Sequence, residues 1–136
     1  MNIDKLIEQL KRHEGVEHYP YLDTVGKTTI GIGRNLDDRG ITIETINQML
    51  REDIELATSE IERIFPKFSN LSENRQLVLA NMSFNMGIPK FLEFKHFWEA
   101  LRSEDWSLAS TEMLDSRWAR QVGQRAIELS DLMREG

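Results

Sequence analysis

The fold is decided by residues 14–33, which read E-G-V-E-H-Y-P-Y-L-D-T-V-G-K-T-T-I-G-I-G. Before Glu14 the apolar residues recur at helical spacing, and from His18 onward aromatic and β-branched residues dominate. Asp, Thr and Gly cluster at 23–26, as they do in turns, and Pro20 is typical of an edge strand. The stretch therefore predicts a helix followed directly by a β-hairpin, with Glu14 at the end of the helix.

The residues around this stretch predict a helix and a small β lobe. The helix is expected over 2–14, because Asn2 can cap it, Gly15 can close it, and the apolar residues between them share one face. The β lobe is expected over about 15–41, with 34–41 as a loop or a short third strand.

Helical patterns fill the rest of the chain. The longest predicts a bridging helix over about 43–65, because apolar residues recur at threes and fours until Pro66 stops it. The next helix, about 73–86, is apolar nearly all round, which predicts a central, buried helix. It belongs to a helical lobe over about 72–136, whose shorter helices are expected at 91–102, 104–114, 117–122 and 124–134.

Composition restricts the class of protein. With 136 residues, 40% hydrophobic and 29% charged, the chain is expected to form a single α+β domain, a small β-hairpin lobe and a mainly helical lobe joined by the long helix. The absence of cysteine excludes disulfides and thiolate metal sites. A net charge of −6 argues against nucleic acid as a partner, because phosphates attract clustered Lys and Arg. No stretch approaches the ~20 apolar residues of a membrane span, and charges interrupt the N-terminus, so neither stable membrane insertion nor a signal peptide is expected.

The candidate catalytic residues are Glu14, Asp23 and Thr29. A carboxyl at the last turn of a helix lies at the negative end of the helix dipole, and shielding from water would further favour its protonated form. A carboxylate in a polar turn, held by backbone N–H groups, stays ionised. Two carboxyls in such different environments can divide the acid and base roles of glycoside hydrolysis, and the Thr29 hydroxyl can help to hold a water. Alternatively, both acids are solvated surface charges. Gly31 and Gly33 leave the returning strand thin, so that another group can approach its backbone.

Other kinds of site find less support in the sequence. The three histidines, at positions 13, 18 and 96, form no metal-binding pair, so neither a metal nor another cofactor is expected. Three tryptophans could stack on a sugar, but their helical spacing favours a place in the core: Trp98, Trp106 and Trp118.

The motif E-G-(x)5-Y-x-D-T-x-G-x-x-T-I-G-I-G, which begins at Glu14, resembles the active-site signature of the T4-type lysozymes of bacteriophages. These enzymes are also called endolysins or muramidases and are classed as glycoside hydrolase family 24. Two further blocks are similar to the family and follow in the same order. Residues 75–87, R-Q-L-V-L-A-N-M-S-F-N-M-G, resemble its central buried helix, and S-R-W at 116–118, with Gln121 and Q-R-A at 124–126, resembles its C-terminal motif.

The resemblance implies a hydrolase that cleaves the β-1,4 bond between N-acetylmuramic acid and N-acetylglucosamine in the glycan strands of peptidoglycan, with inversion and without a cofactor. It implies that Glu14 is the general acid, that Asp23 orients or activates water, and that Thr29 lies beside it. Arg125 matches the arginine that pairs with this glutamate as a supporting ion pair. Substrate-binding positions are matched by Asn81, Asn85 and Gln121, each of which can equally be a packing or solvent contact.

The sequence departs from the family at one residue and in the length of one connection. Arg34 follows Gly33 where the best-known member has a histidine, and the connection to the long helix is shorter.

The resemblance implies a monomer made in the cytoplasm of a host bacterium, acting on the wall in the periplasm once another protein opens the membrane. Two alternatives stay open: a lytic transglycosylase, which needs only one acid, and a non-catalytic wall-binding or tail module on the same fold.

Overall fold

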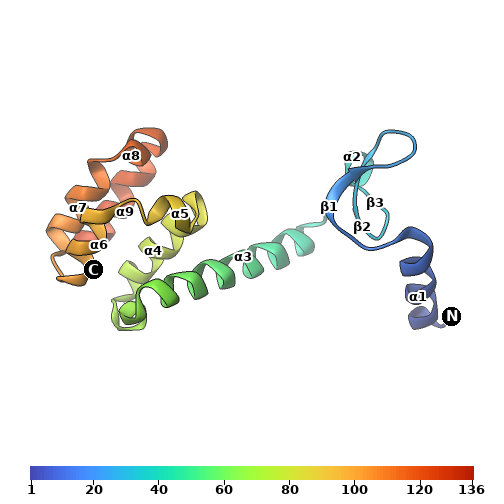
Figure 1. The fold of residues 1–136 in the computed structure, drawn as a ribbon, viewed down its shortest axis with the longest axis horizontal. Helices are drawn as coiled ribbons and strands as arrows, with labels where there is room; N and C mark the ends of the chain where they lie inside the picture. The colour runs from blue at the N-terminus through green and yellow to red at the C-terminus, as the bar shows by residue number, and fades with distance from the viewer. The chain divides into compact units, whose positions relative to one another are not determined.

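The computed structural model describes residues 1–136, which form two compact units, residues 1–48 and 49–136. The first contains a small sheet and the second is helical, and in Figure 1 the colour runs from blue in the first to red at the end of the second. Helix α3, Ile43–Ile64, begins in the first unit and continues in the second. The predicted α+β class, with a small β lobe and a mainly helical lobe joined by a long helix, is confirmed. None of the helices combines the length and the apolar character that crossing a membrane requires.

The sheet of the first unit has three antiparallel strands in the order β1-β2-β3. Strand β1 spans Glu17–Leu22, β2 spans Thr28–Gly31 and β3 spans Arg34–Asn35. The pairing of β1 with β2 is irregular just before Tyr21, and Pro20, which has no N–H to donate to a ladder, lies in this irregular segment. Because β1 lies at the edge of the sheet, the prediction from Pro20 is confirmed.

Helix α1, Ile3–Glu14, is capped at both ends as the sequence predicts. At its start the Asn2 side chain accepts a hydrogen bond from the Lys5 N–H at 3.0 Å. At its end Gly15 adopts a φ of 79° and donates its N–H to the Lys11 carbonyl at 3.0 Å. These caps place Glu14 as the last residue of the helix.

The segment after the sheet is helical rather than extended. Residues 36–39 form α2, Leu36–Arg39, so the prediction of a loop or a strand is wrong there, although a third strand is present just before it. The helix forms because the Asn35 side chain caps it, accepting from the Asp38 N–H at 3.0 Å, and because the Gly40 N–H closes it on the Leu36 carbonyl.

The second unit continues after α3 as a series of short helices. They are η1 Pro66–Asn70 (a 3-10 helix), α4 Glu73–Met86, α5 Ile88–Phe91, α6 Lys95–Arg102, α7 Trp106–Leu114, α8 Arg117–Val122 and α9 Gln124–Glu135. Helix α9 packs against α4, α7 and α8, and α6 packs against α7. The helix predicted at 91–102 starts later, at Lys95, because the separate short helix α5 ends at Phe91. Pro89 lies in the first turn of α5, where its missing N–H is tolerated.

The core of the second unit covers one face of α4. Val78, Leu79 and Met82 are completely buried on this face. The predicted central helix is buried on this face only, since Leu77 is 56% and Phe84 48% exposed. Apolar residues thus occupy several sides of the helix, but the fully buried ones share one side.

The tryptophans contribute to the core, as their spacing predicts. Trp98 and Trp118 are buried, and Trp106 packs half-buried against the same cluster. The Trp98 indole N–H donates to the Phe91 carbonyl at 2.9 Å, which satisfies its buried polar atom. Two of the three rings are thus unavailable for stacking on a sugar.

Candidate active site

Glu14 lies directly against the backbone of Gly33. A Cβ atom placed on Gly33 would stand 2.9 Å from Glu14 Oε2, 3.2 Å from its Cδ and 3.4 Å from its Cγ, and the φ of Gly33 is +65°. Only a residue without a side chain can accept both the backbone angle and this close approach. The prediction of a close approach at the glycines is confirmed at Gly33, whereas nothing lies within 4 Å of the corresponding point on Gly31.

Within the first unit, Glu14 is exposed to solvent and none of the residues of α1 is buried. The first unit alone does not shield the Glu14 carboxyl from water. Glu14 is the last residue of α1 and lies at the negative end of that helix.

Asp23 is held in the hairpin turn by backbone amides, as its sequence context predicts. Its Oδ1 accepts hydrogen bonds from the Val25 N–H at 2.9 Å and the Lys27 N–H at 2.8 Å. Two backbone bonds close the same turn, from the Asp23 N–H to the Lys27 carbonyl and from the Gly26 N–H to the Asp23 carbonyl. The four bonds fix the position of the Asp23 carboxylate in the turn.

Thr29 is 3% exposed, and its hydroxyl donates to the Lys27 carbonyl at 2.9 Å. Lys27 therefore ties the two residues together, since its N–H binds Asp23 and its carbonyl binds Thr29. Because the hydroxyl proton is already used, Thr29 can offer only its oxygen lone pairs to a water.

The acids of α2 fasten the start of β2, a role that sequence reasoning missed. Asp37 Oδ2 accepts from the Thr28 N–H at 2.7 Å, and Asp38 Oδ1 accepts from Lys27 Nζ at 3.2 Å. The bonded Asp38 carboxylate raises the pKa of Lys27 above its usual value. The pattern N-L-D-D at 35–38, an Asn cap followed by acids in a first helical turn, was the available signal.

The polar residues implied by the resemblance in the second unit already have partners there. Asn81 Oδ1 accepts from Arg125 Nε at 3.0 Å and from Nη2 at 2.7 Å. Asn85 Oδ1 accepts from the Trp118 indole N–H at 2.8 Å, and the Gln121 side chain contacts Lys90 Nζ at 3.5 Å. The structure thus brings Arg125 and Asn81 together, whereas Asn85 and Gln121 each bind another residue.

Arg125 and Asn81 also line an open, mostly apolar cavity of about 360 Å³ in the second unit. The remaining lining comes from α3 and α4: Leu50, Ile54, Ala57, Leu77, Ala80 and Phe84.

Arg34 belongs to the first unit. Its Nη1 lies 3.5 Å from the Gly40 carbonyl, so that Arg34 contacts the end of α2.

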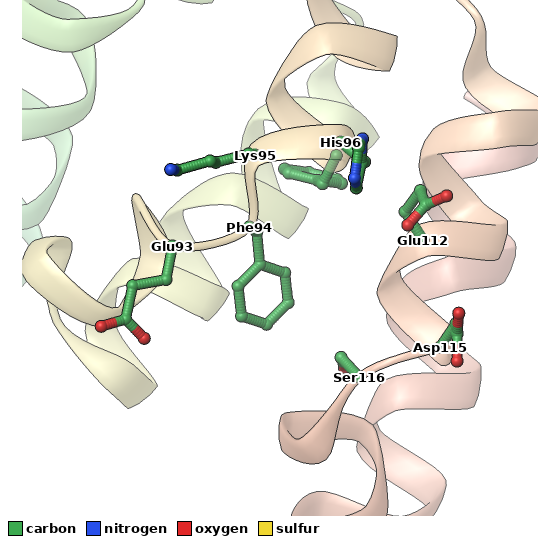
Figure 2. A pocket seen from close by; sticks show the side chains of 8 residues that line it. Glu93, Phe94, Lys95, His96, Glu112, Asp115 and Ser116 are labelled. Carbon is green, nitrogen blue, oxygen red and sulfur yellow. The ribbon is translucent and has the colours of Figure 1, made fainter.

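Another cavity of the second unit, of about 290 Å³, contains none of the predicted site residues. Figure 2 shows Phe94 in its middle, with His96 at the start of α6 and Glu112 on α7 facing each other across it. No group of three or more His, Cys, Asp or Glu side chains could hold a metal ion. His13, His18 and His96 are all exposed.

The first unit therefore offers two carboxyls of different character on one rigid scaffold. Glu14 lies at the end of a helix against Gly33, and the Asp23 carboxylate is bound by the amides of its turn. Such a pair suits the hydrolysis of a glycosidic bond.

Comparison with known proteins agrees with this chemistry. The profile of the phage lysozyme family matches residues 11–134. Two proteins of Dictyostelium discoideum, probable T4-type lysozymes 2 and 1, are 28% and 24% identical to the chain, with 98% of it and 96% of each relative covered. The pre-baseplate central spike protein Gp5 of Enterobacteria phage T4 is 27% identical over 96% of the chain and 28% of the spike protein. Since the family profile covers nearly its whole length, the chain belongs to the phage lysozyme family, a family of lysozyme-type peptidoglycan hydrolases.

Proposed function

We propose that the protein hydrolyses the β-1,4 bond between N-acetylmuramic acid and N-acetylglucosamine in peptidoglycan, with inversion at the anomeric carbon. The observation that carries the proposal is the contact of the Glu14 carboxyl with Gly33, since that contact gives the acid one defined position beside the sheet. Asp23 is fixed in the same unit by its turn. The reaction needs no metal or organic cofactor.

In the proposed mechanism Glu14 gives its proton to the glycosidic oxygen as the bond to the anomeric carbon breaks. A water held beside Thr29 attacks that carbon from the opposite face, and Asp23 accepts the proton that the water loses. An inverting reaction of this kind needs about 6.5–9.5 Å between the two carboxyl groups, which leaves room for the water. Because Glu14 is exposed in the first unit, we propose that bound glycan displaces water from it and so favours its protonated form.

We propose that Arg125 takes part in binding the glycan, with Asn81 orienting its guanidinium through the two hydrogen bonds to its Oδ1. Asn85 and Gln121 are the other proposed contacts for the substrate. An Asn81→Ala variant should then lower turnover less than an Arg125→Met variant, because it loosens the guanidinium without removing its charge. Equal and full activity of both variants would refute the assignment.

The decisive experiment is turnover of purified peptidoglycan by a Glu14→Gln variant. Loss of a general acid should lower the rate by about 10²–10⁴-fold. Glu17→Gln is the matched control, since Glu17 is an exposed acid at the start of β1 and the substitution removes the same charge. If the two variants are equally active, Glu14 is not the acid. Anhydro ends on the released fragments would show a transglycosylase in place of a hydrolase.

A second candidate function is a wall-binding module of a virion that has lost turnover. The match to Gp5 favours it, because that relative is a pre-baseplate central spike protein of a phage. The alignments with all three relatives extend over 159 to 163 positions against 136 residues here, so these relatives carry residues that this chain lacks. Peptidoglycan binding without turnover, equal in the native chain and in Glu14→Gln, would support this module.

We further propose that the protein is a monomer made in the cytoplasm of a host bacterium, and that it reaches the wall when another protein permeabilises the inner membrane. Lysis of cells that express the chain should then depend on a membrane-permeabilising agent. Lysis without such an agent, or a dimer in sedimentation equilibrium, would contradict the proposal.

A further inference from the structure

A cavity of about 250 Å³ in the second unit is lined by an excess of positive charge. Lys67 of η1, Arg75 of α4 and Arg102 of α6 line it, together with a single acid, Glu104. A neighbouring cavity of about 310 Å³ shares Lys67 and Arg102. The chain as a whole has a net charge of −6.

Arg75 forms a fixed, charged wall of this cavity. Its Nε donates to the Met133 carbonyl at 2.8 Å and its Nη2 to the Arg134 carbonyl at 3.1 Å. On its other side the guanidinium lies 4.0 Å from the centre of the Trp106 ring. Gly136 also lies against the guanidinium. Arg75 forms no ion pair, and burial lowers its pKa below its usual value.

Lys67 and Arg102 are exposed cations without a protein partner. Neither forms an ion pair or a side-chain hydrogen bond, although both line the same cavity as Arg75. Glu104 forms no ion pair with any of the three. Lys67 and Arg102, which have no partner, and Arg75, which is held in place, therefore line the same cavity.

We propose that this cavity binds a phosphate group. Guanidinium groups match the geometry of phosphate oxygens and bind them through paired hydrogen bonds, while lysine adds a mobile point charge. The lining carries three cations and one carboxylate. A phosphate with two negative charges matches this balance better than a ligand with one carboxylate. All of the lining residues lie outside the residues assigned to glycan cleavage, so the site stands independently of that activity.

The test is a titration of ¹⁵N-labelled protein with inorganic phosphate, with chloride added to keep the ionic strength constant. We expect saturable shifts of the amides around Arg75 and Arg102, and a dissociation constant at least tenfold higher in the Lys67→Gln, Arg102→Gln double variant. The matched control is Lys95→Gln, Arg117→Gln, which removes two exposed cations of the same unit that do not line the cavity. Its dissociation constant should change less than twofold.

Shifts that do not saturate, or an equal loss of affinity in both double variants, would overturn the proposal. Thermal unfolding confirms that both variants fold, and the single Lys67→Gln variant replaces the double if it does not. Vesicles of phosphatidylglycerol and of phosphatidylcholine then identify the source of the phosphate. Binding to the former alone, lost in the Lys67 and Arg102 variant, indicates a lipid headgroup, whereas saturation by phosphate without vesicle binding indicates a soluble phosphate ester.

Discussion

Replacing Gly33 by alanine should displace the Glu14 carboxyl while leaving the sheet in place. The new Cβ would stand 2.9 Å from Oε2, and ordinary contact begins at 3.4 Å, so the carboxyl must move by about 0.5 Å. Because a misplacement of about 1 Å costs about 10²-fold in rate, half of it should cost about tenfold. The φ of +65° adds backbone strain of about 1–2 kcal/mol in the folded state.

Gly31→Ala is the control that separates displacement from strain. Gly31 has a φ of +69° but nothing within 4 Å of its Cβ position, so alanine there meets the same backbone strain without touching the acid. Both variants should lower the melting temperature by a similar amount, on the order of 4 °C per kcal/mol. Only Gly33→Ala should lower kcat/KM on soluble glycan fragments by the further factor of about ten. Equal kcat/KM in the two variants would refute the claim that the contact with Gly33 positions Glu14.

Three further substitutions test other parts of the structure. Asp23→Asn should keep most of the stability, because its amide oxygen still accepts the two turn hydrogen bonds, but should lose activity, whereas Asp23→Ala should lose activity and about 1–2 kcal/mol of stability as well. Full turnover by the Asn variant would count against the role of the charge. Leu79→Ala should cost about 2–5 kcal/mol in denaturant unfolding, because the side chain is completely buried, and a smaller cost would mean that the core closes around the cavity. The pair of Lys27 and Asp38 raises the folded-state pKa of the lysine above 10.5, so its contribution is present below that pH and disappears as the pH rises through the raised value. A Lys27→Met variant should therefore lack this alkaline loss in pH-dependent unfolding, and an unchanged profile would show that the pair contributes nothing.

Local chemistry explains why the sequence alone predicted the first unit well. Asn2 and Gly15 cap α1 through bonds to residues three and four positions away, so the end of the helix at Glu14 is a local property. The turn at Asp23 is local for the same reason. A short helix such as α2 was missed because the Asn35 cap and the Gly40 closure compete with strand formation over only a few residues.

The sequence by itself determined where the helices and strands lie and which two acids share one scaffold, since caps, turns and periodicity act between neighbours in the chain. Only the tertiary structure decided that Glu14 rests against Gly33, that Arg125 binds Asn81, and that three cations border one cavity. Each of these contacts joins segments that are far apart in sequence. Local sequence patterns do not predict these contacts, because the contacts depend on how whole helices and strands pack.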